Sequence, residues 1–469
     1  MIPVELMLFN SFVFLGFFIV TLVIYQVVNS KARKLILLLA SYSFYAVWDW
    51  RFLPLLMFSS VLDFTTGKLL WKEQQEKKRK FLLALSLTGN LLPLFFFKYY
   101  NFLVDNLNLF TAGRGNSNTF NHLDIILPLG ISFYTFQTLS YSIDLYQKKI
   151  QPARSIIDFS LFVSFFPQLI AGPIEKSNRL LPQLSQLSSL RKSNLKYGLL
   201  TLLYGLFLKS IIGDSCAIWA DKVFAETIIT TPIEKLLGTF LFSVQIYMDF
   251  SGYSLMAIGL AKCFGIRLST NFAQPYLASN ITDFWRRWHI TLSLWLKEYI
   301  YIPLGGNKNG KPKQLVNLFI TMLIGGIWHG ANWTFVIWGA VHGAALIVHK
   351  IIKKQVFSLP KFINIALTFL FVSMTWVLFR ANSMQQAQEI FLGIGTVFSC
   401  NLDTTMWQPF IWCGGTMFLL DWLNRRYRTH LFIRKWPKPI QYAIITATIT
   451  VLFVYLLPQR PQPFIYFQF

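Results

Sequence analysis

Long apolar runs recur along the whole chain, and this feature most constrains what it can fold into. A helix of about 18 apolar residues or more can cross a hydrocarbon core of about 30 Å. Only 13% of the 469 residues are charged, about half of the 25% that is usual in soluble domains. A transmembrane β-barrel would instead show alternating segments of about 10 residues. We therefore expect an all-α, polytopic membrane protein.

The net charge of +23 is spread over short basic loops between the apolar runs. Such loops are favoured on the cytoplasmic side of a membrane and attract anionic lipid. The basic residues of these loops include Lys31, Arg33, Lys34, Lys72, Lys77, Lys78, Arg79, Lys80, Lys308, Lys311, Lys313, Arg425, Arg426 and Arg428. Because no basic soluble domain accompanies them, we expect no nucleic-acid partner.

Several common kinds of site have no signature in the sequence. The 4 cysteines are scattered without CxxC spacing, so we interpret them as small apolar side chains. They are Cys216, Cys263, Cys400 and Cys413. There is no GxSxG, HExxH or GxxxxGK[ST] motif. Histidines in separate segments lack HxxxH or HxH spacing, so we expect no metal.

The distribution of basic loops predicts roughly 12 crossings, with both termini outside the cytoplasm. The predicted spans are 6–28, 35–48, 52–66, 81–102, 123–147, 197–220, 233–262, 315–328, 332–349, 361–380, 407–424 and 440–457. The N-terminal run lacks a basic n-region and a cleavage site, which predicts a retained span. With no linker and no internal repeat, we expect one domain over residues 1–469, with its core motif region at about 123–350.

Two segments do not fit a simple crossing. Segment 155–174 has basic residues on both flanks and contains Pro167, Gly172 and Pro173, which predict a broken, re-entrant segment. Segment 281–303 combines charged and aromatic residues, and we expect it to lie along the cytoplasmic interface.

Residues that can carry chemistry gather between 244 and 342. Ionisable groups inside a membrane are costly, so each one there suggests a function. The segment contains VQIYMDFSGYS (244–254), NFAQPYLASNITDFWRRWHITLSLWLKEYIYIPLGG (271–306) and GGIWHGANWTF (325–335).

His329 is the leading candidate. A helix that enters at residue 315 places it about 20 Å deep, at or beyond the middle of the hydrocarbon core. Gly325 and Gly326 permit close backbone approach, and Gly330 permits a sharp turn. Asn332 is within reach to bond a ring nitrogen and select the tautomer. His329 is therefore either a general base in a lined cavity or a packing histidine with a fixed tautomer.

The other ionisable residues are open to two interpretations each. His289 is expected to share an interfacial helix with Arg286 and Arg287, as a base with a lowered pKa or as an ordinary surface histidine. The two arginines suit phosphates, of a substrate or of lipid headgroups. Asp249 is expected to orient a histidine or, preferably, to pair with an arginine.

The remaining histidines are assigned to structure or solvent. His342, on the returning helix, is expected to be structural. His122, His349 and His430 lie near loop ends and are expected to be solvated.

These strings resemble the membrane-bound O-acyltransferase family, in particular its bacterial branch of alginate O-acetyltransferase membrane subunits. The matching strings are LPLGISFYTFQTLSYSIDLY (127–146), SFFPQLIAGPI (164–174), QIYMDFSGYS (245–254), NFAQPYL (271–277), ITDFWRRWHITLSLWLKEYIYIPLGGN (281–307), IGGIWHGANWTFVIWG (324–339) and FIYFQF (464–469). At Leu255 many members of this branch carry an acidic residue, so a carboxylate role at that position is absent here.

The resemblance implies a funnel-shaped multi-helix fold with a channel, in the bacterial inner membrane. It implies that His329 is the catalytic histidine and that His289 is a second histidine of the site. The family moves an acyl group from a thioester donor to a hydroxyl. This branch serves acetylation of extracellular polysaccharide or peptidoglycan, with a separate extracytoplasmic SGNH-type acetyltransferase as partner.

We therefore expect an acetyl-CoA-dependent O-acetyltransferase that holds no bound cofactor and meets membrane lipid, the acyl donor and a glycan acceptor. Asn332, with Trp328 and Asp249, would support the reaction, Asn332 or a backbone N–H by stabilising the oxyanion. Arg286, Arg287 and Lys308 would hold CoA phosphates. The alternatives are D-alanyl transfer toward teichoic acid, with a carrier-protein donor, and a transporter or flippase of a lipid-linked saccharide.

Overall fold

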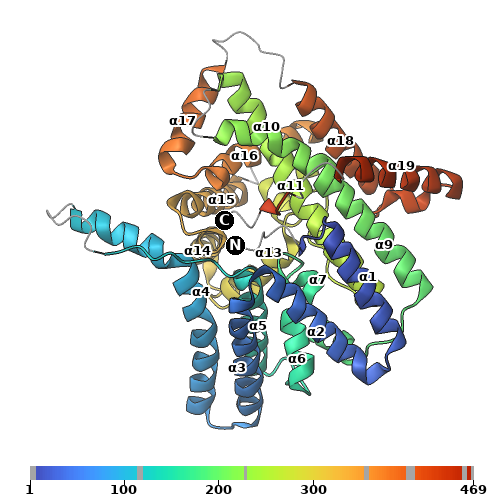
Figure 1. Cartoon of the computed structure of the whole chain (residues 1–469). Helices are drawn as coiled ribbons and strands as arrows, with labels where there is room; N and C mark the ends of the chain where they lie inside the picture. Colours follow the sequence, from blue (N-terminus) through green and yellow to red (C-terminus); the bar gives the residue numbers. More distant parts are fainter. Residues whose placement is uncertain are drawn as a thin grey trace. The chain divides into compact units, whose positions relative to one another are not determined.

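A computed structural model describes residues 7–112, 120–225, 230–352, 359–397, 407–456 and 462–465 (Figure 1). In these ranges every regular element is a helix, which confirms the all-α prediction. The chain forms two compact units, which divide at 199/200, 256/257 and 269/270. Two long helices, α9 (Lys192–Phe207) and α11 (Pro232–Cys263), each contain one of these division points.

The first unit is a bundle of long helices. Ser11 and Asn29 cap the first two helices by accepting hydrogen bonds from Phe14 N and Ala32 N, which satisfies backbone donors that would otherwise lack partners. The helices are α1 (Phe12–Val27), α2 (Ser30–Asp49), α3 (Leu53–Lys72), α4 (Glu76–Ala112) and α5 (Ile131–Tyr146). Helix α4 extends to Ala112, ten residues beyond the end of the predicted span 81–102.

Segment 155–174 is broken, as the sequence predicts. Helix α6 (Ile156–Ser164) ends at Phe165, and α7 (Phe166–Leu169) begins there with Pro167 in its first turn. Proline is tolerated at that position because it has no N–H to leave unpaired. The short helix α8 (Ser177–Ser185), which we did not expect, follows.

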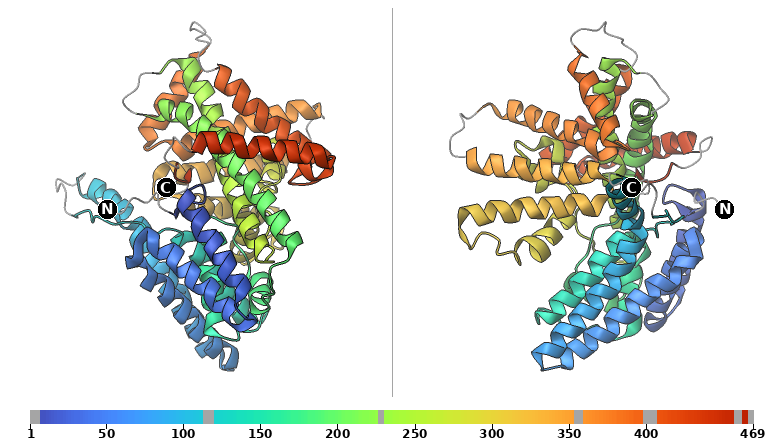
Figure 2. Two further views of the ribbon diagram at one scale, coloured as in Figure 1. Left: turned by 45° about the vertical axis from the view of Figure 1, so that its right-hand side comes forward. Right: turned by 90° about the vertical axis from the view of Figure 1, so that its left-hand side faces the viewer.

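The second unit contains the predicted helix pair around residue 330. Helices α14 (Gly310–His329), α15 (Trp333–Ile352) and α16 (Lys361–Arg380) lie side by side, coloured from yellow to orange in Figure 2. Helix α14 begins five residues before the predicted start at residue 315. It is therefore about 30 Å long, with His329 as its last residue.

Segment 281–303 is not a single interfacial helix. It forms α12 (Ile281–Trp285), α13 (Ile290–Leu296) and the π-helical turn η5 (Lys297–Tyr301). The chain turns at His289, whose φ of 42° lies in the left-handed region. The expectation that His289 shares a helix with Arg286 and Arg287 is therefore wrong. Backbone bonds from Ala273 N to Arg287 O and from Ile290 N to Asn271 O hold this turn.

The unit also contains α10 (Asp214–Phe224), which follows the π-helical turn η3 (Leu208–Gly213). Its C-terminal part contains α17 (Met384–Gly395), α18 (Trp407–Arg426), the 3-10 helix η7 (Phe432–Lys435) and α19 (Lys438–Leu456). Helix α17 was not expected from the sequence.

Within the described residues, 6 helical stretches are long and apolar enough to cross a membrane. They are Ser30–Lys72, Glu76–Ala112, Lys192–Phe224, Trp333–Ile352, Lys361–Arg380 and Lys438–Leu456. Six of them suffice for a multi-pass protein, whereas the predicted number of roughly 12 crossings stays a prediction.

Candidate active site

His329 ends helix α14 inside a cage of aromatic rings. Its side chain is 5% exposed. The rings of Trp328, Trp338 and Phe379 meet it at steep angles, with centroids 4.9, 5.2 and 5.1 Å away. Trp338 comes from α15 and Phe379 from α16, so three adjacent helices build the cage. A polar ring at a helix end, shielded from solvent by aromatic side chains, is well placed for proton transfer in a dry site.

Glycines let α14 and α15 approach closely below this cage. A Cβ on Gly326 would lie 2.4 Å from Phe335 O and 2.9 Å from Gly339 Cα, so the two backbones are in contact there, as expected. A Cβ on Gly330 would lie 2.1 Å from the Phe335 ring. The φ of Gly330 is −161°, which is ordinary extended backbone. The chain turns here between α14 and α15, as expected, and glycine is needed at 330 for space rather than for its backbone angles.

Asn332 holds the turn rather than the imidazole. Its Nδ2 donates to Asn382 O at 2.8 Å, and its Oδ1 accepts from Thr334 N at 3.0 Å. The first bond ties the turn to the residues after α16, and the second caps the start of α15. The expected hydrogen bond that selects the His329 tautomer is therefore not made.

His289 lies at the turn between α12 and α13 and is fully buried. Non-glycine residues with positive φ are uncommon and cost about 1–3 kcal/mol, so the surrounding contacts must impose this conformation. The ring packs edge-on against Phe250, with centroids 4.8 Å apart. Burial lowers the pKa of His289 to about 3, so its imidazole is neutral near pH 7.

The tautomer of His289 follows from its neighbour Asn271. The Nδ1 atom lies 3.1 Å from Asn271 Oδ1, which also accepts from Thr291 N and Thr291 Oγ1. A backbone N–H can only donate, so the atom it meets is the amide oxygen. That oxygen can only accept, so Nδ1 carries the proton and Nε2 keeps its lone pair. A lone pair at Nε2 is what a base or a hydrogen-bond acceptor for a substrate requires.

Trp328 joins the two histidines into one site. Its indole centroid lies 4.9 Å from the His329 ring and 6.3 Å from the His289 ring. The two histidines come from segments forty residues apart, and both lie against this one side chain, which is 5% exposed. The structure thus brings together three of the predicted site residues.

His342 has a different environment on α15. Its Nδ1 accepts from Trp285 Nε1 at 3.3 Å, and its Nε2 lies 3.0 Å from Thr375 Oγ1. Indole N–H is only a donor, so Nδ1 is unprotonated and Nε2–H donates to Thr375. Thr375 Oγ1 in turn donates to Val372 O. Both ring nitrogens take part in buried hydrogen bonds, which fits the expected structural role.

The other histidines are partly as expected. His122 and His430 are exposed. His349 is half-buried and its Nδ1 lies 2.9 Å from Thr282 Oγ1, so the expectation of a solvated side chain is wrong for it.

Asp249 has neither an arginine nor a histidine as its partner. Its carboxylate lies 3.6 Å from Lys209 Nζ and accepts a hydrogen bond from Ile465 N at 2.7 Å. Lys209 also contacts Asp214 at 2.5 Å and donates to Gln462 O at 2.9 Å. Lys209 offsets part of the charge of two buried carboxylates, and together with Asp249 it hydrogen-bonds the described C-terminal residues. In the sequence, the signal for this cluster was Lys209, a lysine inside an apolar run shortly before Asp214.

The predicted donor-binding residues are divided between two environments. Arg287 pairs with Asp283 at 2.9 Å and donates to Ala273 O at 3.3 Å, so it braces the chain next to His289. Arg286 and Lys308 are exposed. Only these last two present a cation to the surroundings.

Sequence reasoning missed three residues of the site. Trp338 and Phe379 form the cage of His329, and Asn271 sets the tautomer of His289. Asn271 begins the string 271–306, but it is a neutral amide and was not among the ionisable residues that drew attention to that string. The described residues contain no group of three or more His, Cys, Asp or Glu side chains that could hold a metal ion.

Comparison with known proteins gives a consistent result. Residues 151–362 match the model of the MBOAT, membrane-bound O-acyltransferase, family. A peptidoglycan O-acetyltransferase of Helicobacter pylori is 39% identical over 437 residues, which cover 86% of this chain and 81% of that protein. A probable alginate O-acetylase of Pseudomonas aeruginosa is 41% identical over 82% of this chain and 74% of that protein. A teichoic acid D-alanyltransferase of Bacillus subtilis is 25% identical over 60% of this chain and 71% of that protein.

Proposed function

The chain belongs to the membrane-bound O-acyltransferase family and is a multi-pass acyltransferase, and we propose that it transfers acetyl groups for O-acetylation of an extracytoplasmic polysaccharide or peptidoglycan. The observation that carries this proposal is the pair of buried histidines whose rings both lie close to that of Trp328. The relatives that cover most of the chain are an O-acetyltransferase and an O-acetylase, which supports acetyl as the group.

In the proposed reaction, neutral His329 accepts the proton of the attacking hydroxyl as its oxygen bonds to the thioester carbonyl carbon. The carbon–sulfur bond then breaks, the thiolate leaves and takes up a proton, and the acetyl ester remains on the acceptor. General base catalysis of this kind contributes about 10²–10⁴-fold in rate. His289, with its lone pair at Nε2, would orient the acceptor hydroxyl or the donor.

We propose that the donor is acetyl-CoA, which reaches the site from the cytoplasm. Arg286 and Lys308 are the exposed cations that suit its phosphates. The oxyanion would be held by a backbone N–H, since the Asn332 amide braces the turn. Basic loops support an inner-membrane protein with both termini outside the cytoplasm. A separate SGNH-type acetyltransferase would deliver the group to the glycan.

The test compares strains that lack the gene, carry it, or carry it with a disrupted start codon. Surface glycans are treated with mild alkali, and released acetate is quantified by mass spectrometry. We expect acetate from the strain with the gene and at least a tenfold decrease in both others. Equal acetate in all three strains would contradict the proposal.

Transfer of D-alanine toward teichoic acid is the second candidate, because D-alanyltransferases are also similar to this chain. The same alkaline hydrolysate distinguishes the two, since it releases D-alanine in one case and acetate in the other. Binding of an acylated carrier protein to the purified enzyme would support D-alanyl transfer. Acetyl transfer from acetyl-CoA without any carrier protein would contradict it. Saccharide transport in proteoliposomes without acyl transfer would instead indicate a transporter or flippase.

A further inference from the structure

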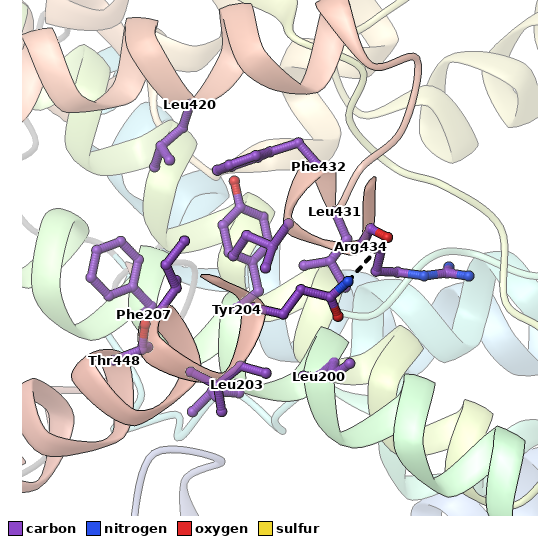
Figure 3. A pocket seen from close by; sticks show the side chains of 13 residues that line it. Leu200, Leu203, Tyr204, Phe207, Leu420, Leu431, Phe432, Arg434 and Thr448 are labelled. Atoms are coloured by element: carbon purple, nitrogen blue, oxygen red, sulfur yellow. Dashed lines mark hydrogen bonds between the residues drawn. The ribbon is translucent and has the colours of Figure 1, made fainter. Parts of the chain in front are cut away.

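An apolar cavity in the second unit shares no lining residue with the histidine site. It contains about 680 Å³ of empty space, part of which is open to the outside. Its walls come from α9, α18, the segment at η7 and α19 (Figure 3).

The walls suit a hydrocarbon chain. Leu203 and Phe207 of α9 and Ile444 and Ile445 of α19 all line the cavity. Both helices belong to stretches long and apolar enough to cross a membrane. On α19 only Leu452 is buried, so this helix packs loosely against its neighbours although its side chains line the cavity. Bilayer lipid surrounds such a helix, and its acyl chains are the apolar molecules at hand to fill the gap.

One wall of the cavity carries positive charge. Arg434 lines it, is exposed, and extends away from the apolar side chains in Figure 3. The connection 425–438 contains six arginines and lysines and no acidic residue. Gln441 donates to Arg434 O at 3.4 Å and to Trp436 O at 2.8 Å, which fixes η7 to the first turns of α19. An apolar cavity with Arg434 in its wall, next to a basic connection, complements a molecule with a hydrocarbon tail and an anionic head.

We propose that this cavity binds an anionic glycerophospholipid, with one acyl chain between α9 and α19 and its phosphate at Arg434. The lipid completes the packing of α19 against the rest of its unit. This site is independent of the acyl-transfer chemistry proposed above, because it shares no residue with it.

The test is lipid binding by the full-length protein, measured by native mass spectrometry. The protein is delipidated in mild detergent and titrated with phosphatidylglycerol or with phosphatidylcholine of the same acyl chains. We expect one phosphatidylglycerol per chain, with at least a fivefold preference over phosphatidylcholine. Leu203→Trp fills the cavity and should abolish binding of this lipid. Its control is Leu199→Trp, at an exposed position of α9 that does not line the cavity.

The headgroup part of the proposal has its own pair of variants. Arg434→Gln should reduce the preference for phosphatidylglycerol to below twofold, whereas Lys435→Gln, next to it but outside the lining, should leave the preference in place. Arg434 is exposed, so its variant tests the proposal even if Leu203→Trp does not fold. A wild-type protein that binds neither lipid, a folded Leu203→Trp that binds like wild type, or an Arg434→Gln that keeps the full preference would each overturn the proposal.

Discussion

Two histidines on neighbouring helices share one tryptophan and yet have different surroundings. The Trp338 ring lies 5.2 Å from His329 and 4.7 Å from His342. His342 is in the middle of α15, where side chains of α12 and α16 hydrogen-bond both of its ring nitrogens. His329 ends α14 at a turn, where Trp and Phe rings surround it. Burial and aromatic neighbours are therefore common to both, and position at a helix end distinguishes the candidate base.

The largest expected effect is that of His329→Ala. Loss of the proposed base should reduce acetyl transfer about 10²–10⁴-fold. The variant should also lose some stability, because it deletes a buried ring, but less than His342→Ala, which in addition removes the partner of two hydrogen-bonding groups. Transfer from acetyl-CoA, measured in proteoliposomes, gives the rate, and thermal unfolding in detergent gives the stability. A variant that is stable and fully active would show that His329 only packs.

His342→Ala is expected to lower stability strongly and activity little. The change deletes a buried ring and leaves Trp285 Nε1 and Thr375 without their partner, which should cost about 2–5 kcal/mol of unfolding free energy. Transfer per folded molecule should stay within about threefold of wild type. His349→Ala on the same helix is the control, because this residue is only half-buried. If His342→Ala lost activity while it kept its stability, the distinction between the two histidines would fail.

The sequence predicts the helices better than it predicts the contacts of the site. Apolar runs and flanking charges place α15, α16 and α19 to within a few residues, because burial in lipid imposes a simple pattern. The partners of Asp249, Asn332 and His289 depend on residues far away in sequence, such as Ile465, Asn382 and Asn271. Spacing along one chain carries no information about such partners.

Gly326→Ala should have an intermediate effect, because it disturbs the helix pair that positions His329. Its added methyl group would contact Phe335 O and the Gly339 backbone, so α14 and α15 must separate, which should cost about 1–3 kcal/mol. His329 lies three residues further on and should shift, with a loss of transfer. Gly325→Ala is the matched control, since its methyl group meets only the end of the Leu296 side chain, at 3.1 Å. Thermal unfolding and transfer rates of the pair should therefore diverge, and equal behaviour would contradict the close crossing.

The smallest expected effect extends the comparison to His289. Asn271→Ala removes the acceptor that holds the proton on Nδ1, so the other tautomer, with the proton on Nε2, becomes accessible. A hydrogen bond of this kind contributes about 0.5–1.5 kcal/mol, which corresponds to a loss of transfer of up to about tenfold. Asn271→Asp keeps an acceptor for Nδ1 and should recover part of the rate. If Asn271 is only structural, both variants should be less stable and the transfer rate per folded molecule should not change. That result would exclude His289 from the active site.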